Sequence, residues 1–167
     1  MDSISSSRRT LLEQVPIFGG LKPATLELLL RHSRSVVRES QGVFFHQGDP
    51  ATSLFVVEEG EVAIVKTEGH NRYQLARLGV GACFGEMAAM DMEPRSASVV
   101  ALVTTRALEV PLEALYELYR FDLKQFTVMQ MNLGRELSRR LRRIDDYLFQ
   151  LHVESQHGVG QGATRDG

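Results

Sequence analysis

The chain has 167 residues, of which 43% are apolar and 24% are charged, and its formal net charge at pH 7 is −2. This composition is that of an ordinary globular domain, and it excludes a disordered chain and a surface that attracts nucleic acid or an acidic membrane. The single cysteine, Cys83, excludes an internal disulfide and a cysteine-based zinc cluster.

The first part of the chain predicts a lead-in followed by a helix. Residues 1–10 are rich in serine and contain two arginines, and we expect a frayed start there, with one helical turn over residues 11–15. Residues 1–20 together form an N-terminal lead-in. A helix is expected over residues 22–32, because Pro23 suits a first helical turn and the leucines that follow give the segment an apolar side.

From residue 33 to residue 110, short runs of β-branched and aromatic residues alternate with turn residues. This pattern is typical of an all-β sandwich or barrel. The expected strands are residues 36–37, 43–45, 54–57, 62–65, 73–78, 98–103 and 108–110.

Two helices are expected after the strands, over residues 111–119 and residues 122–156. Within the longer helix, large aliphatic residues recur in steps of four and three, which is the spacing of a dimer seam over about two heptads. The helix either lies on its own domain or pairs with a second copy in a parallel homodimer, and the pattern favours the dimer. The seam residues are Leu137, Leu141, Ile144, Leu148 and Leu151.

The rest of the C-terminal part is polar. Five arginines lie between residues 135 and 143, and we interpret them as a solvated face rather than a nucleic-acid patch. The glycine-rich residues 157–167 predict a flexible tail or linker. No helix pair is expected after the long helix, so a DNA-binding helix-turn-helix is not predicted.

Residues 84–99 combine the residue types that recognise a small anionic ligand. Gly85 lacks a Cβ, so a ligand can approach its backbone, and the residues that follow favour a short helical turn with free N–H groups. Pro94 ends that turn, and Arg95 supplies a guanidinium that can bind two phosphate oxygens. Glu86 supplies an acceptor for sugar hydroxyls. The alternative, a structural ion pair between Glu86 and Arg95, explains the glycine and the proline less well.

The string Gly85-Glu86-x-Ala, followed by Pro94-Arg95-x-Ala-Ser, resembles the phosphate-binding cassette of the cyclic nucleotide-binding domain family. This family includes the catabolite activator protein, the regulatory subunit of protein kinase A and cyclic-nucleotide-gated channels. Flanking strings extend the resemblance from residue 15 to about residue 151. They are Val15-Pro16-Ile17-Phe18, Gly48-Asp49, Glu59-Gly60 and Leu78-Gly79-x-Gly81.

The resemblance implies a fold that is mainly β with flanking helices. This fold is an antiparallel β-roll, or jelly-roll barrel, over residues 21–121, with an N-terminal helix and a long C-terminal lid and dimerisation helix over residues 122–156. It also implies that Glu86 binds the ribose 2′-hydroxyl and that Arg95 binds the cyclic phosphate, with backbone N–H groups completing the cradle. The binding residues implied for the cassette are Gly85, Glu86, Met87, Ala88, Arg95, Ser96 and Ala97.

The residues of the long helix that would contact the base differ from those of the family. Aligning Arg139-Arg140-Leu141 with the similar string of the catabolite activator protein puts Ile144 and Asp145 where that protein contacts adenine through hydroxyl residues. The Asp145 carboxylate can accept two hydrogen bonds from guanine or one from adenine, which favours cGMP. Ser96 favours cAMP, because the cGMP-dependent kinases of the family carry threonine there. We expect cAMP as the ligand, with cGMP a close second.

Three functions are weighed against this pattern. The first is a sensor or regulatory domain that binds a cyclic mononucleotide and reports occupancy to a partner protein or an output domain. The second is a relative that has lost the ligand and acts as a dimerisation or docking module, and the presence of both Glu86 and Arg95 argues against it.

The third function is a metalloenzyme on a similar β-roll. The five histidines show no metal-ligand spacing, and no nucleophile pattern or phosphate loop is recognisable. We therefore expect a protein that is not an enzyme and that holds no metal or cofactor. No apolar run is long enough to span a bilayer, and the start does not resemble a signal peptide, so a cytoplasmic protein without a membrane partner is expected.

Overall fold

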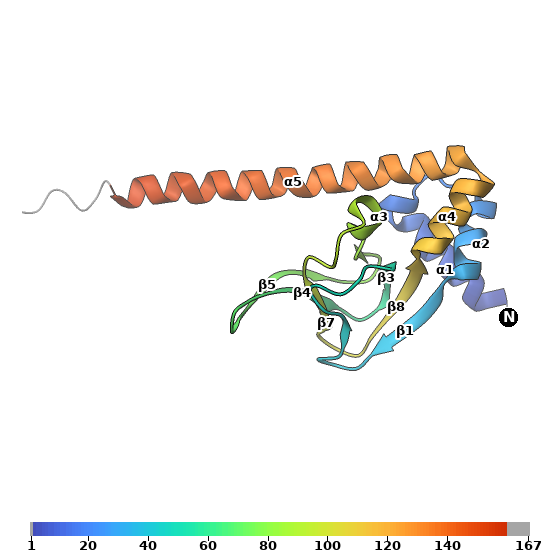
Figure 1. Cartoon of the computed structure of the whole chain (residues 1–167), viewed down its shortest axis with the longest axis horizontal. Coiled ribbons are helices and arrows are strands. Elements are labelled where there is room, and N and C mark those ends of the chain that lie inside the picture. The colour runs from blue at the N-terminus through green and yellow to red at the C-terminus, as the bar shows by residue number, and fades with distance from the viewer. Residues whose placement is uncertain (1, 160–167) are drawn as a thin grey trace, which may run out of the picture.

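The computed structural model describes the backbone of residues 2–159 and the side chains of residues 6–87 and 90–154. These residues form a β-roll with helices gathered at one end, and one long helix runs past the roll (Figure 1). The helices are α1 (Asp2–Gln14), the 3-10 helix η1 (Pro16–Phe18), α2 (Pro23–His32), α3 (Ala88–Asp91), α4 (Leu112–Phe121) and α5 (Leu123–Val159). The strands are β1 (Arg34–Arg38), β2 (Val43–Phe45), β3 (Ser53–Glu59), β4 (Val62–Glu68), β5 (Asn71–Leu78), β6 (Cys83–Phe84), β7 (Ser98–Ala101) and β8 (Thr105–Pro111).

The strands form two four-stranded antiparallel sheets, in the orders β1-β8-β3-β6 and β2-β7-β4-β5. Apolar side chains from both sheets meet in the interior of the roll, where the stacked rings of Phe55 and Phe84 lie 5.1 Å apart. The fold that the resemblance implies, mainly β with flanking helices, is confirmed.

Strand β3 is buried on both faces. Its side chains alternate, so that Phe55 and Val57 point into the roll while Leu54 and Val56 pack against the helices. This double burial explains why the strand is a continuous apolar run rather than an alternating one. The helical core on the outer side is formed by residues from α1, η1, α2, α4 and α5, which include Leu12, Phe18, Leu26, Leu118 and Met129.

Helix α5 is fastened to the body at its first turns. Gln125 Oε1 accepts a hydrogen bond from the Lys22 N–H at 2.6 Å, and the Asn132 side chain donates to the carbonyl of Gly19 at 2.7 Å. Beyond this base the helix extends away from the helical end (Figure 1), and its later seam residues are exposed. The exposed fractions are 58% at Leu141, 48% at Ile144, 56% at Leu148 and 44% at Leu151.

The expectation of a frayed start over residues 1–10 is wrong, because α1 already begins at Asp2. Tertiary contacts hold this helix despite its serine-rich sequence. Leu12 is fully buried, and the Arg8 guanidinium donates to Glu58 Oε1 at 2.8 Å and to Ser35 Oγ at 2.6 Å. Helical propensity is a weak prior that such contacts override.

Two short elements and the end of the long helix also differ from the expectation. The 3-10 helix η1 and the two-residue strand β6 are not predicted by the sequence, because elements this short leave no periodic pattern. Helix α5 continues to Val159, beyond the expected end at residue 156. Of the expected flexible tail, residues 160–167 lie outside the described residues. Within the described residues, no helix combines the length and the apolar character that crossing a bilayer requires.

Candidate functional site

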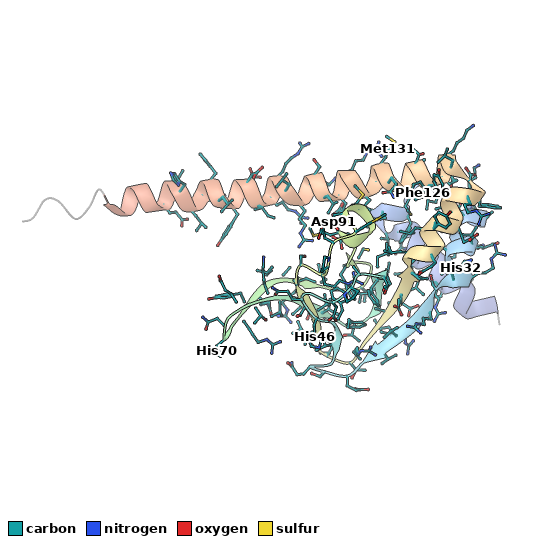
Figure 2. The ribbon with its side chains drawn as sticks, in the orientation of Figure 1. His32, His46, His70, Asp91, Phe126 and Met131 are labelled. Carbon is teal, nitrogen blue, oxygen red and sulfur yellow. The ribbon has the colours of Figure 1, made fainter. Side chains whose placement is uncertain are left out.

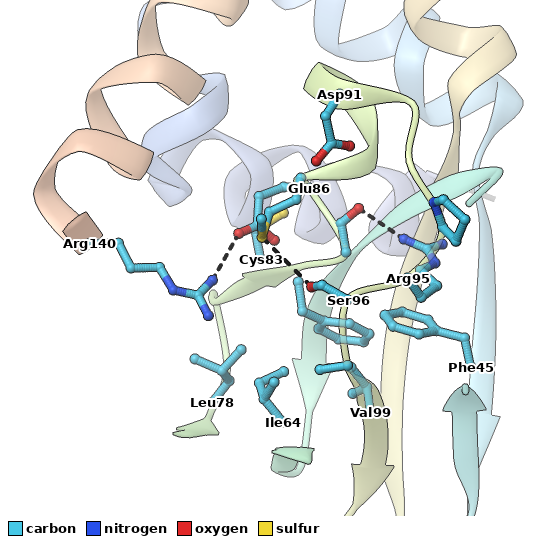
Figure 3. Close-up of a pocket in the computed structure, with 15 residues that line it drawn as sticks. Phe45, Ile64, Leu78, Cys83, Glu86, Asp91, Arg95, Ser96, Val99 and Arg140 are labelled. Atoms are coloured by element: carbon cyan, nitrogen blue, oxygen red, sulfur yellow. Dashed lines mark hydrogen bonds and ion pairs between the residues drawn. The ribbon is translucent and has the colours of Figure 1, made fainter. Parts of the chain in front are cut away.

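The loop between β6 and β7 encloses one side of a cavity of about 60 Å³ (Figure 3). A volume of this size accepts a few water-sized groups, whereas sites for drug-sized ligands run from roughly 300 to 1,000 Å³. Ala88 begins α3, and its side chain lies outside the described residues. The other cassette residues that the resemblance implies all line the cavity: Gly85, Glu86, Met87, Arg95, Ser96 and Ala97.

Gly85 makes room for the arginine of the cassette. Its φ is 73°, a left-handed conformation that residues with a Cβ rarely adopt. A Cβ built at this position would lie 2.6 Å from Arg95 Nη1. Glycine is therefore required at position 85 for two reasons: the left-handed backbone conformation and the close approach of the Arg95 guanidinium.

The Arg95 guanidinium is buried and firmly held. It lies 4.0 Å from the centre of the Phe45 ring, and it donates to the carbonyls of Gly85 at 2.9 Å and Ser53 at 2.6 Å. Arg95 Nε is buried without a hydrogen-bond partner in the part of the chain that the structure describes. An unpaired buried N–H is costly, so this atom is a donor for which an anion in the cavity would provide the acceptor.

Burial lowers the pKa of the Arg95 guanidinium, because desolvation disfavours its charged form. The carboxylates of Asp49, Glu109 and Glu86 oppose this shift of the pKa. The turn between β2 and β3 also fixes the backbone of the arginine, since Arg95 N–H donates to the Asp49 carbonyl at 2.9 Å and Gly48 N–H donates to the Arg95 carbonyl at 2.8 Å. The Gly48-Asp49 string of the sequence thus supports the cassette directly.

Glu86 lies on another wall of the same cavity, and only 7% of its surface is exposed. Burial raises the pKa of its carboxyl, and the nearby guanidinium of Arg140 opposes this rise. Arg140 Nη1 approaches Glu86 Oε1 at 3.3 Å, so helix α5 contacts the binding loop through this ion pair (Figure 3). The carboxylate of Glu136, also on α5, raises the pKa of Glu86 further.

A larger groove of about 900 Å³ adjoins the small cavity and separates β5 from α5. Ile144 and Tyr147 line the α5 wall of this groove. Asp145 is exposed on the same helix and belongs to the lining of neither space within the described residues. The two spaces share five lining residues: Ile64, Leu78, Cys83, Glu86 and Arg140.

Three side chains that carry a charge or support one at the site are not identified as site residues by the sequence. Phe45 belongs to a strand pattern, and nothing local indicates that its ring supports a guanidinium. Asp91 also lines the cavity, and a lone acidic residue does not by itself indicate a binding role. Arg140 has a usable signal, because it lies one helical turn before Ile144 and therefore shares its face of α5.

The histidines whose side chains the structure describes do not gather at the site. Figure 2 shows His46 and His70 on the β-roll and His32 at the helical end of the molecule. Among the residues that the structure describes, no group of three or more histidine, cysteine, aspartate or glutamate side chains is placed to hold a metal ion.

Comparison with known proteins extends these observations. The chain matches the family model described as cyclic nucleotide-binding domain over residues 37–122. It is 35% identical over 140 residues to the cyclic AMP receptor protein of Thermus thermophilus, which covers 83% of this chain and 63% of that protein. It is 36% identical over 100 residues to a cyclic nucleotide-gated potassium channel of Mesorhizobium japonicum, which covers 60% of this chain and 26% of the channel.

The chain thus spans less than two thirds of the length of either relative. Among solved structures, a cyclic nucleotide-binding domain from Methylobacillus flagellatus has a TM-score of 0.76 with this chain at 25% identity. That match covers 89% of this chain and 84% of the other.

Replacing Gly85 by alanine tests the close approach of Arg95. We expect Gly85→Ala to lower the free energy of unfolding more than Gly81→Ala does. Gly81 has a φ of 80° and open space where a Cβ would stand, so it shares only the backbone strain of about 1–2 kcal/mol. The measurement is denaturant unfolding of both variants. Equal losses would show that Arg95 moves aside without penalty.

The raised pKa of Glu86 predicts a pH dependence of stability. Between the ordinary glutamate pKa of 4.5 and the raised pKa, Glu86 is protonated to a larger extent in the folded state than in the unfolded state. This carboxyl therefore lowers the free energy of unfolding as pH rises through that window. We expect the stability of Glu86→Gln relative to the natural protein to increase as pH rises from 4.5 through that window. Unfolding curves between about pH 4 and pH 7 measure this, and Glu113→Gln, on the exposed side of α4, corrects for the loss of one charge. A stability difference that is constant with pH would contradict the expectation.

Proposed function

Because the chain belongs to the cyclic nucleotide-binding domain family, we propose that it is a cytoplasmic regulatory domain that binds a cyclic mononucleotide, cAMP before cGMP. One observation carries the proposal. A buried guanidinium with an unpaired Nε and a buried carboxylate, Arg95 and Glu86, line the same small cavity. The guanidinium suits the cyclic phosphate of such a ligand, and the carboxylate suits its ribose 2′-hydroxyl. The similarity to a protein named as a cyclic AMP receptor supports cAMP as the first ligand.

The two spaces divide the ligand between them. The small cavity accepts the cyclic phosphate at Arg95 and the ribose 2′-hydroxyl at Glu86, with backbone N–H groups near Gly85, Met87, Ala88 and Ser96 as further donors. The cavity is too small for a whole nucleotide, so the base extends into the adjoining groove. There it meets Ile144 and, after a local adjustment of α5, Asp145.

Occupancy is reported through α5. The ribose hydroxyl and the Arg140 guanidinium compete for the same carboxylate, since Arg140 contacts Glu86 Oε1 in the structure. A ligand can shift the equilibrium between two helix positions only by the difference in its affinity for those two positions. Exchange of the Arg140 contact for contacts between the base and α5 supplies such a difference.

The exposed seam of α5 supports a parallel homodimer. Its aliphatic residues from Leu141 onward repeat at heptad spacing and are about half exposed, which is unusual for large apolar side chains on a helix that only covers its own domain. We propose that the seam pairs with a second copy and that the dimer passes the signal to a partner protein or an output domain. Within the described residues, no helix follows α5 that could form a helix-turn-helix.

The second candidate is a docking module that binds no nucleotide. The bonds that already occupy the site favour it, because Arg95 donates to two backbone carbonyls and Glu86 is paired with Arg140. Calorimetric titration with cAMP and cGMP separates the two functions. Absence of heat with both nucleotides at high micromolar concentration would favour the docking module.

Loss of the Arg95 side chain should remove a bidentate, charge-assisted contact. We expect Arg95→Ala to weaken cAMP binding by at least about 2 kcal/mol, or roughly 30-fold. Arg95→Lys keeps the positive charge but loses the paired donors of the guanidinium, so we expect an intermediate loss of affinity. This variant can still be measured if Arg95→Ala does not fold. Arg142→Ala, on the exposed surface of α5, is the matched control and should bind normally. An Arg95→Ala affinity equal to that of the control would place the phosphate elsewhere.

Base recognition is tested at the adjacent aspartates of α5. Asp145→Ala should weaken cGMP binding more than cAMP binding, because guanine can use both carboxylate oxygens and adenine only one. Asp146→Ala removes the same charge one position further along the helix. Titration of both variants with both nucleotides gives the comparison. An equal loss for the two nucleotides at Asp145 would remove this residue from base recognition.

A further inference from the structure

A carboxylate that the proposed contacts do not use lines the phosphate cavity. Asp91 ends the one-turn helix α3, and Figure 3 shows its side chain extending from α3 toward the loop that carries Glu86 and Arg95. Asp91 Oδ1 accepts a hydrogen bond from the Glu93 N–H at 3.1 Å. Within the described residues it forms no ion pair, so its negative charge is not neutralised by a protein cation.

The charges around the cavity leave no surplus of positive charge. Its lining contains two guanidiniums, Arg95 and Arg140, and two carboxylates, Glu86 and Asp91. In the structure Arg140 is paired with Glu86, and the two charges left over, Arg95 and Asp91, are opposite in sign. The field of Arg95 is reduced further by Asp49 and Glu109, which interact with the same guanidinium. The four charged side chains of the lining therefore sum to zero, so the cavity carries no net positive charge that would favour a doubly charged ligand.

Phosphate esters differ in this respect. A cyclic phosphodiester carries one negative charge at neutral pH, whereas a phosphomonoester carries close to two, because its second pKa is about 6. Opening the ring of a cyclic nucleotide by hydrolysis converts the first kind of ester into the second. The energy of a ligand charge in a fixed field is proportional to that charge, so a single carboxylate repels the monoester about twice as strongly.

We infer that Asp91 determines the charge selectivity of the phosphate site, favouring the singly charged cyclic diester over doubly charged phosphomonoesters. The inference rests on the proposed function and deepens it. Arg95 attracts the doubly charged ester more strongly than the singly charged one, and the repulsion from Asp91 offsets that preference. The ring-opened 5′-nucleotide is thereby bound more weakly than it would be without Asp91.

The test compares ligands of different charge on one substitution. Asp91→Asn removes the charge and keeps the oxygen that accepts the Glu93 N–H. Displacement of a fluorescent, base-labelled cAMP measures the affinities of cAMP, of the singly charged methyl ester of AMP, and of AMP. We expect about a 3-fold gain for both singly charged ligands and about a 10-fold gain for AMP, because doubling the charge squares the factor.

Glu93→Gln is the matched control. It removes the same charge two positions along the chain, at a residue that is exposed like Asp91 but lies outside the cavity lining, and it should leave all three affinities nearly unchanged. Equal gains for AMP and its methyl ester in Asp91→Asn, or the same pattern in Glu93→Gln, would overturn the role of Asp91. If the natural protein does not bind the fluorescent nucleotide at all, the proposed function itself fails, and the inference fails with it.

Discussion

The structure of the site depends on how one guanidinium is held inside the protein. Burying a charged group is expensive unless it is paired or hydrogen-bonded. Arg95 meets this requirement with two backbone carbonyls, one aromatic face and the carboxylates of Asp49 and Glu109. The arrangement leaves Nε unpaired within the described residues, so the fold stabilises the cation while a donor stays available for a ligand. A bound anion that accepts this N–H removes the free-energy penalty of the unpaired donor, and that gain adds to the affinity.

Elements far apart in the sequence contribute to holding this group. The β2–β3 turn fixes the backbone of Arg95, β3 provides the Ser53 carbonyl, and β2 provides the Phe45 ring. Helix α5 reaches the same cavity from another side through Arg140. The cavity therefore lies where both sheets and the long helix meet.

Local signals in the sequence are sufficient for the strands and for the cassette. Alternation of apolar residues and turn residues identifies seven of the eight strands, and the glycine, proline and arginine spacing identifies the loop that lines the cavity. The parts that could not be predicted depend on pairs distant in the chain. Arg8 and Glu58 are 50 positions apart, and Arg140 and Glu86 are 54 apart. No periodic pattern carries such pairings, so the helix α1 and the contact from α5 to the cavity became visible only in the fold.

The way α5 is anchored gives it the properties of a lever arm. Its first turns are fastened to the body by Gln125 and Asn132, and the helix runs on to Val159. At 1.5 Å per residue the portion beyond Asn132 is about 40 Å long, so a tilt of roughly 5° at the fulcrum displaces the far end by about 3–4 Å. If occupancy of the cavity tilts the helix as proposed, a side-chain exchange close to the fulcrum becomes a displacement of about 3–4 Å at the far end of α5.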